Sequence, residues 1–180
     1  EYAEDARQNA SQNASVPVFD FTALKESGQR FDIIHLGDVL EHLPNPFEVI
    51  ENLQTLLEPE GVFFIEGPLE INPSFVYWSA INFRKLSKLC GKPISIGTTA
   101  PTHLLRTNKK AQKQFFTDRL GYCCLYFEIE ETGWPYFQNK LSLSNCNLSL
   151  LIRHGIGFLA ILTSKIFPKF GNRFSAIFQP

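Results

Sequence analysis

Three side chains that could do acid–base chemistry lie close together in the sequence: Asp38, Glu41 and His42. An imidazole titrates near physiological pH, so His42 can take a proton from a hydroxyl or amine nucleophile. It is therefore the best candidate in the chain for a general base. A structural or substrate-shaping role for His42 is an equally supported alternative.

The elements that must position these side chains begin with an apolar segment at Phe31–Leu36. It is apolar on both faces apart from Asp32 and His35, which is typical of a strand covered on both sides, as in a parallel sheet. We therefore expect a buried, hydrogen-bonded His35. Gly37 would let the backbone approach a ligand closely where the strand ends. Asp38 would then face a cleft, the alternative being a surface acid.

A helix and a second strand follow the candidate residues. Asn45 can cap a helix that begins at Pro46, and Pro59 and Gly61 should end it before an apolar strand at Val62–Ile65. The helix would place one apolar stripe on the sheet: Phe47, Ile50, Leu53, Leu56 and Leu57. Strand, helix and strand together predict a βαβ unit with parallel strands.

The remaining elements are expected from composition, turn signals and capping residues. They are a strand at Val16–Phe19, a helix at Ser74–Leu89, a helix from Thr107 or Asn108 to Arg119, a strand at Tyr122–Glu130 and a strand at Asn172–Phe178.

Two motifs at matched spacing resemble class I S-adenosylmethionine-dependent methyltransferases, in particular the ubiquinone-biosynthesis-like group that acts on small molecules. Phe31–Pro46 reads FDIIHLGDVLEHLPNP, and Leu56–Glu66 reads LLEPEGVFFIE. The resemblance implies one domain over residues 1–180, with an α/β, Rossmann-like, doubly wound sheet that is mostly parallel with one antiparallel strand. It also implies an N-terminally truncated chain that supplies about five strands. The first strands and their glycine-rich turn would then precede Glu1.

The resemblance also implies S-adenosylmethionine as the cofactor and assigns residues to it. Asp20, at the end of the third strand, would lie near the adenine amino group, and Phe21 could pack on the adenine ring. Leu36, Gly37 and Asp38 would line the pocket at the end of the next strand. The alternative for Asp20 is that it caps the turn that follows.

His42, His103 and Tyr77 are the candidates for the substrate side. His103 falls in a loop where the family often places a histidine near the substrate entrance, although a surface or capping histidine is equally supported. Tyr77 and Trp78 could wall a substrate pocket, but aromatic residues in a helix are more often part of the core. We expect small-molecule methyl transfer to a metabolite, lipid, quinone or sugar. The alternative is a non-catalytic, methyltransferase-like binding or scaffolding module.

Charge and cysteine content exclude other classes. Seventeen basic and eighteen acidic residues form no basic stripe, so a nucleic-acid partner is not expected. The cysteines lack metal-ligand spacing, which predicts no metal site and reduced thiols in a cytoplasmic protein. These cysteines are Cys90, Cys123, Cys124 and Cys146.

A long apolar stretch lies at Leu148–Phe167. Arg153, His154 and Lys165 interrupt it, and its uncharged run from Gly155 to Ser164 is far shorter than a membrane-spanning helix requires. Three interpretations remain: a helix covering the sheet, which we favour, a lid over the substrate site, or an interfacial helix. Peripheral membrane contact is thus an alternative that the sequence does not favour.

Overall fold

The computed structural model describes residues 17–91, 103–134, 136 and 148–180. Its sheet has the strand order β1-β2-β4-β3, formed by β1 (Phe31–Gly37), β2 (Leu57–Pro68), β3 (Cys123–Glu130) and β4 (Arg173–Gln179). β1 and β2 are parallel, whereas β4 is antiparallel to both β2 and β3. The expected mixed sheet with one antiparallel strand is therefore confirmed.

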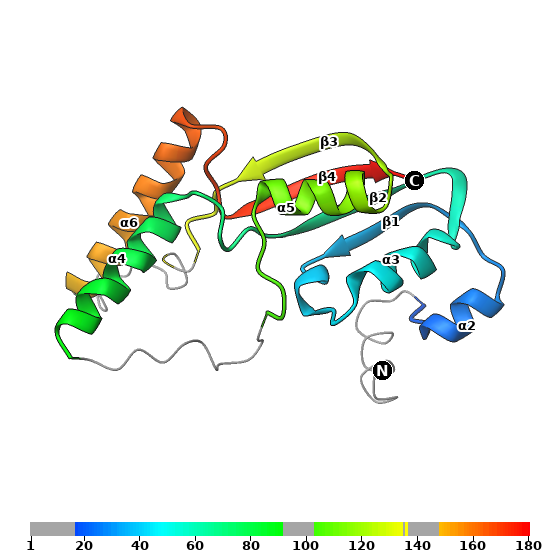
Figure 1. The fold of residues 1–180 in the computed structure, drawn as a ribbon, viewed down its shortest axis with the longest axis horizontal. Coiled ribbons are helices and arrows are strands. Elements are labelled where there is room, and N and C mark those ends of the chain that lie inside the picture. The colour runs from blue at the N-terminus through cyan, green and yellow to red at the C-terminus, as the bar shows by residue number, and fades with distance from the viewer. Residues whose placement is uncertain (1–16, 92–102, 135, 137–147) are drawn as a thin grey trace.

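Two helices pack on one face of this sheet, namely α3 (Pro46–Gln54) and α5 (Lys109–Gln114) (Figure 1). Asn108 caps α5, because its side chain accepts the N–H of Ala111 at 2.9 Å. The chain continues from α5 as a π-helical turn, η2 (Phe115–Arg119). Its Phe116 is fully buried and stacks on Phe178 of β4, with the ring centroids 4.2 Å apart. Burial of such aromatic rings is a main source of hydrophobic stabilisation.

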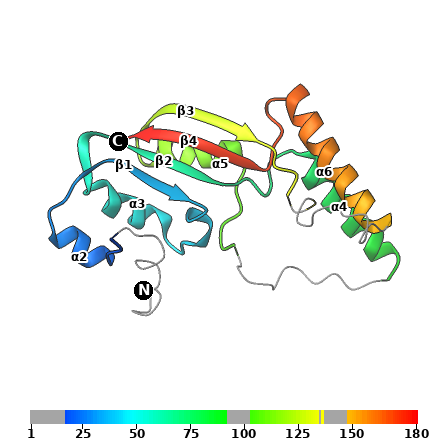
Figure 2. The same ribbon diagram turned by 180° about the vertical axis from the view of Figure 1, so that it is seen from behind.

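The opposite face of the sheet has no described helix on it (Figure 2). Our expectation of a first strand covered on both sides is wrong for these residues, since only Leu36 of β1 is buried. Ile33 is 62% exposed, and His35 is exposed although hydrogen-bonded. Side chains alternate between the faces of a strand, so a helix layer on one face protects only every second residue.

The βαβ unit forms as predicted, but its helix ends earlier. Asn45 and Pro46 occupy the cap and the first helical position. The helix stops at Gln54, and Leu57 already belongs to β2. Pro59 and Gly61 therefore lie within the strand rather than ending the helix. A break in the β1–β2 register absorbs them, since Phe31 pairs with Leu57 whereas Ile33 pairs with Val62.

The strand expected at Val16–Phe19 is not found. Val16 lies outside the described residues, and residues 17–20 have no regular structure. Asp20 instead caps α2 (Phe21–Glu26), where its Oδ1 accepts the N–H of Ala23 at 2.7 Å. The capping alternative for Asp20 is thus confirmed, because an unpaired helix N–H is a ready partner for a carboxylate. Its adenine role stays a prediction.

The long helices α4 (Phe75–Leu89) and α6 (Leu148–Ile166) pack against each other at one end of the sheet (Figure 1). Ser74 caps α4 by accepting the N–H of Tyr77 at 3.0 Å, as the sequence predicts. The arrangement differs from the favoured expectation that α6 covers the sheet. Its buried positions are Gly157 and Ala160, and such small side chains suit close contact with another helix. A lid role for α6 stays a prediction.

The connections at this end meet at the side chain of Asn72, which is only 3% exposed. Its amide donates to the carbonyls of Gly171 and Lys169 at 3.0 and 3.2 Å, and its carbonyl accepts the N–H of Lys109 at 3.3 Å. Gly171 comes so close to β3 that an added Cβ would clash with the carbonyl of Glu130. The contact therefore requires glycine.

Gly171→Ala should lower the free energy of unfolding by about 1–3 kcal/mol, because the new methyl group meets backbone that cannot move aside. Urea denaturation followed by circular dichroism would measure it. Gly155→Ala is the matched control, since nothing lies within 4 Å of a Cβ at that helical position. It should stabilise the protein by about 0.5–1 kcal/mol. Equal stability of the two variants would contradict the packing described here.

Tyr122 should give the protein a specific sensitivity to alkali. Its hydroxyl donates to Gln54 Oε1 at 2.7 Å, and burial, then the Glu51 carboxylate, raises the pKa of Tyr122 to about 12. The unfolded chain releases this proton near the ordinary pKa of 10.0, but the folded chain keeps it longer. Its contribution is therefore complete below that ordinary pKa and is lost as the pH rises towards the folded value.

The loss should be visible as a steeper fall in the free energy of unfolding between pH 10 and about 12 for the parent protein than for Tyr122→Phe. Comparing the two chains by urea titration across this interval cancels the contributions of all other groups. Parallel curves would show that Tyr122 titrates alike in the folded and unfolded states.

Candidate functional site

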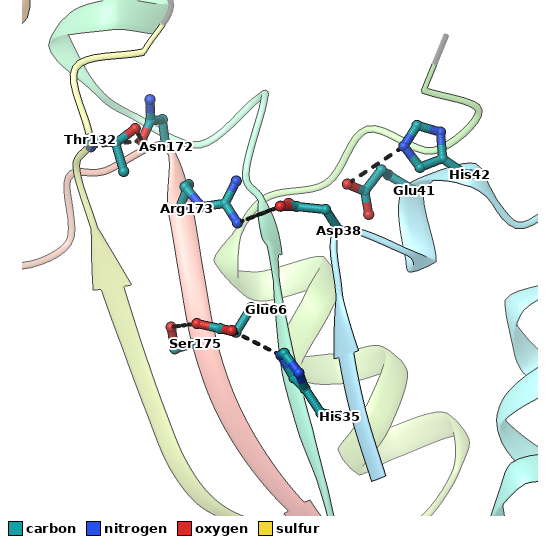
Figure 3. Close-up of polar contacts among 9 residues, drawn as sticks. All are labelled: His35, Asp38, Glu41, His42, Glu66, Thr132, Asn172, Arg173 and Ser175. Carbon is teal, nitrogen blue, oxygen red and sulfur yellow. Dashed lines mark hydrogen bonds and ion pairs between the residues drawn. The ribbon is translucent and has the colours of Figure 1, made fainter. Parts of the chain in front are cut away.

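Asp38 forms the turn at the carboxyl end of β1. Its φ of 53° lies in the left-handed region, which is uncommon outside glycine but is tolerated by aspartate. Its N–H donates to the Glu66 carbonyl at 3.0 Å. The carboxylate forms an ion pair with Arg173 at the start of β4, with N–O distances of 2.9 Å to both oxygens (Figure 3). The turn and the ion pair together fix a half-exposed carboxylate at the edge of the sheet.

A 3₁₀ turn, η1 (Leu40–His42), follows directly and buries Glu41, which is 7% exposed. The backbone carbonyl of Glu41 accepts the N–H groups of Leu104 and Leu105 at 2.8 and 3.1 Å. These bonds attach a segment from much later in the chain to the end of β1. They are the reason that His103 reaches the site.

His42 and His103 lie edge to face, with their ring centroids 4.9 Å apart. Nε2 of His42 is 4.0 Å from Oε1 of Glu41 (Figure 3). Nδ1 of His103 is hydrogen-bonded to the carboxylate of Glu70, which also pairs with Arg106 at 2.9 Å. The structure thus brings together two of the predicted substrate-side residues, and their carboxylate neighbours can orient them and stabilise their protonated forms.

A second polar group crosses the open face of the sheet. Glu66 of β2 accepts from Ser175 of β4 at 3.1 Å and is 2.9 Å from Nε2 of His35 on β1 (Figure 3). Between this group and η1 the surface is hollowed, and the walls of the hollow include Glu41, Glu66, Gly67 and Phe174. Carboxylates from two strand ends therefore face one small cavity at the edge where doubly wound sheets bind ligands.

Other predicted residues lie apart from this cluster. Tyr77 is half-buried on α4 and has no hydrogen bond or ring contact to His42 or His103 in the described structure. The Leu36 side chain is packed in the core, so only its backbone is available to a ligand. Phe21 lies on α2 and is 42% exposed. The cofactor roles of Leu36, Gly37, Asp38, Asp20 and Phe21 remain predictions.

Sequence reasoning missed Arg173, Glu70 and the pairing of Glu66 with His35. Glu66 closes the second motif and could have been noticed as an acid at a strand end. Arg173 and Glu70 gave no such signal, because their partners are distant in the sequence.

Glu41, His42 and His103 could hold a divalent cation. One oxygen or nitrogen from each lies within 4.8 Å of the others, and a carboxylate with two imidazoles is a donor set that zinc, manganese or iron accepts. Our expectation of no metal site considered mainly the cysteines and did not foresee this convergence. It is neither confirmed nor excluded.

Comparison with known proteins gives a family match for half of the chain. A family model described as a methyltransferase domain matches residues 3–92. A ubiquinone biosynthesis O-methyltransferase from Haemophilus ducreyi is 30% identical over 70 residues, covering 34% of this chain and 30% of that protein. One from Glaesserella parasuis is 39% identical over 70 residues, covering 33% and 29%. The matched stretch spans less than a third of these curated relatives.

Solved structures align over most of the chain at low sequence identity. A SAM-dependent methyltransferase from Archaeoglobus fulgidus gives a TM-score of 0.48 at 18% identity, covering 92% of this chain and 66% of that one. A cyclopropane-fatty-acyl-phospholipid synthase-like protein from Lactobacillus casei gives 0.42 at 10% identity, covering 92% and 62%.

If the donor set is competent, Co²⁺ or Zn²⁺ should bind the protein with one site, and His103→Gln should weaken binding at least tenfold by removing one ligand. Titration calorimetry with the metal salt alone would measure it. His35→Gln is the matched control, since His35 lies on the open face of the sheet and outside the donor set. Equal affinity for the parent and the His103 variant would reject the site.

Proposed function

Because this chain belongs to the methyltransferase domain family, we propose that it takes part in methyl transfer from S-adenosylmethionine to a small molecule. The observation that carries the proposal is the constellation at the carboxyl ends of β1 and β2. There Asp38 is held in a left-handed turn next to Gly37, and the His42–His103 pair lies on the adjoining turn.

We assign cofactor binding to the Gly37–Asp38 turn. Gly37 is exposed and has no side chain, so the backbone can approach a ligand. The Asp38 carboxylate offers a negative charge to the amino group at the aminoacyl end of the cofactor. The ion pair with Arg173 holds that carboxylate in one orientation before the ligand arrives, which reduces the ordering cost of binding.

We assign the acceptor side to His42 and His103. Methyl transfer to a sulfonium carbon is an in-line displacement, so much of the rate can come from positioning the nucleophile. An acceptor hydroxyl must also lose its proton, and His42, beside the Glu41 carboxylate, is placed to receive it. The curated relatives are named O-methyltransferases, which supports an oxygen nucleophile for this chain as well.

The test is titration calorimetry of the complete protein with S-adenosylmethionine and S-adenosylhomocysteine. We expect both to bind, and Asp38→Asn to weaken binding about tenfold, equivalent to about 1.4 kcal/mol. Asparagine tolerates the left-handed turn, so this variant removes the charge and keeps the backbone. Asp118→Asn is the control, because Asp118 is an acid of η2 that bonds to its neighbour Thr117.

Absence of heat with both ligands would overturn the proposal and favour a non-catalytic binding module. Unchanged affinity in Asp38→Asn would reject the assignment of that carboxylate while leaving methyl transfer in place. A normal affinity combined with a lower kcat in His42→Gln would locate the proton acceptor separately from the cofactor site.

A further inference from the structure

Helix α6 has its apolar side turned outward. Its exposed large side chains recur every three or four residues, which places them along one face of the helix. They are Leu148, Leu151, Ile152, Phe158, Leu159, Leu162 and Ile166, each between 44% and 74% exposed. The residues buried on the opposite side are small, Gly157 and Ala160. A helix of a water-soluble protein normally has the reverse arrangement.

Helix α4, which packs beside α6, adds to this apolar area. Trp78, Leu86 and Leu89 are 58%, 59% and 84% exposed, and Phe83 is 70% exposed. Together these side chains and those of α6 define what we call the α4–α6 surface. Exposed apolar residues at this density commonly mark a docking site, and Trp is typical of the boundary between water and lipid headgroups.

The charge of the two helices identifies the kind of partner. Neither α4 nor α6 contains an aspartate or glutamate, and they carry five basic residues: Arg84, Lys85, Lys88, Arg153 and Lys165. The rest of the chain therefore holds twelve basic and eighteen acidic residues. The positive charge is thus concentrated around the apolar area, which is the combination that binds a membrane surface containing anionic lipids.

Two other occupants fit less well. A second copy of the chain would bring the same cations face to face, since a twofold interface repeats one patch on both subunits. A membrane-spanning α6 agrees with its length and mean hydropathy of 1.3. However, the uncharged run from Gly155 to Ser164 covers only about 15 Å of a hydrocarbon core of about 30 Å.

We propose that the α4–α6 surface docks on the surface of an anionic lipid bilayer, with its apolar side chains in the headgroup region and its cations against lipid phosphates. Because α4 follows the carboxyl end of β2 directly, docking brings the Asp38–His42 edge of the sheet near the membrane (Figure 1). This inference does not depend on methyl transfer and can be tested without cofactor.

The experiment is co-sedimentation of the complete protein with vesicles of phosphatidylcholine alone or with 30% phosphatidylglycerol. We expect binding to the anionic vesicles at least tenfold stronger than to the neutral ones, with a marked loss at high salt. Phe158→Ser combined with Leu162→Ser should reduce binding at least tenfold. Lys85→Glu combined with Lys88→Glu should abolish the preference for anionic lipid.

Leu125→Ser is the matched control, because Leu125 is also exposed, at 55%, but lies on β3. Circular dichroism of each variant confirms that it is folded. Binding that none of the α4 or α6 variants alters would overturn the proposal. So would resistance to carbonate extraction, which indicates a spanning helix, or a lipid-independent dimer that Phe158→Ser with Leu162→Ser dissociates.

Discussion

The buried side chain of Asn72 is the contact on which the arrangement of this protein most depends. Its hydrogen bonds join the end of β2 to the start of α5 and to the segment between α6 and β4. Leaving such a buried amide without partners costs about 1–3 kcal/mol. The three connections are therefore held in one geometry, which is completed by the close approach of Gly171 to β3.

The same end of the sheet carries the candidate site, and its residues are likewise held by contacts between distant parts of the chain. Arg173 belongs to the last strand and orients Asp38 at the end of the first. The carbonyl of Glu41 binds the segment that supplies His103. Each of these bonds needs the β2–β4 pairing in place, so formation of the site follows formation of the sheet rather than preceding it.

The two chemical regions are also related in space. Helix α4 leaves directly from the strand that ends beside the Asp38 turn, and α6 returns to β4 through the segment that Asn72 holds. A docked α4–α6 surface would therefore present the His42–His103 pair to molecules at the lipid boundary. Such a position suits an acceptor with an apolar body and a reactive hydroxyl, because each part then lies in the solvent that it prefers.

The sequence by itself determined the elements with strong local signals. The apolar run of β1, the Pro46 start of α3 and the Asn108 cap of α5 were predictable because hydrophobic spacing and capping depend on neighbouring residues. It could not show that Leu57 belongs to β2, because that is decided by pairing with Phe31. Only the tertiary structure decided that His103 meets His42, that Arg173 meets Asp38, and that α6 turns its apolar side outward. Those outcomes depend on which distant surfaces pack together, and no local pattern in the chain contains that information.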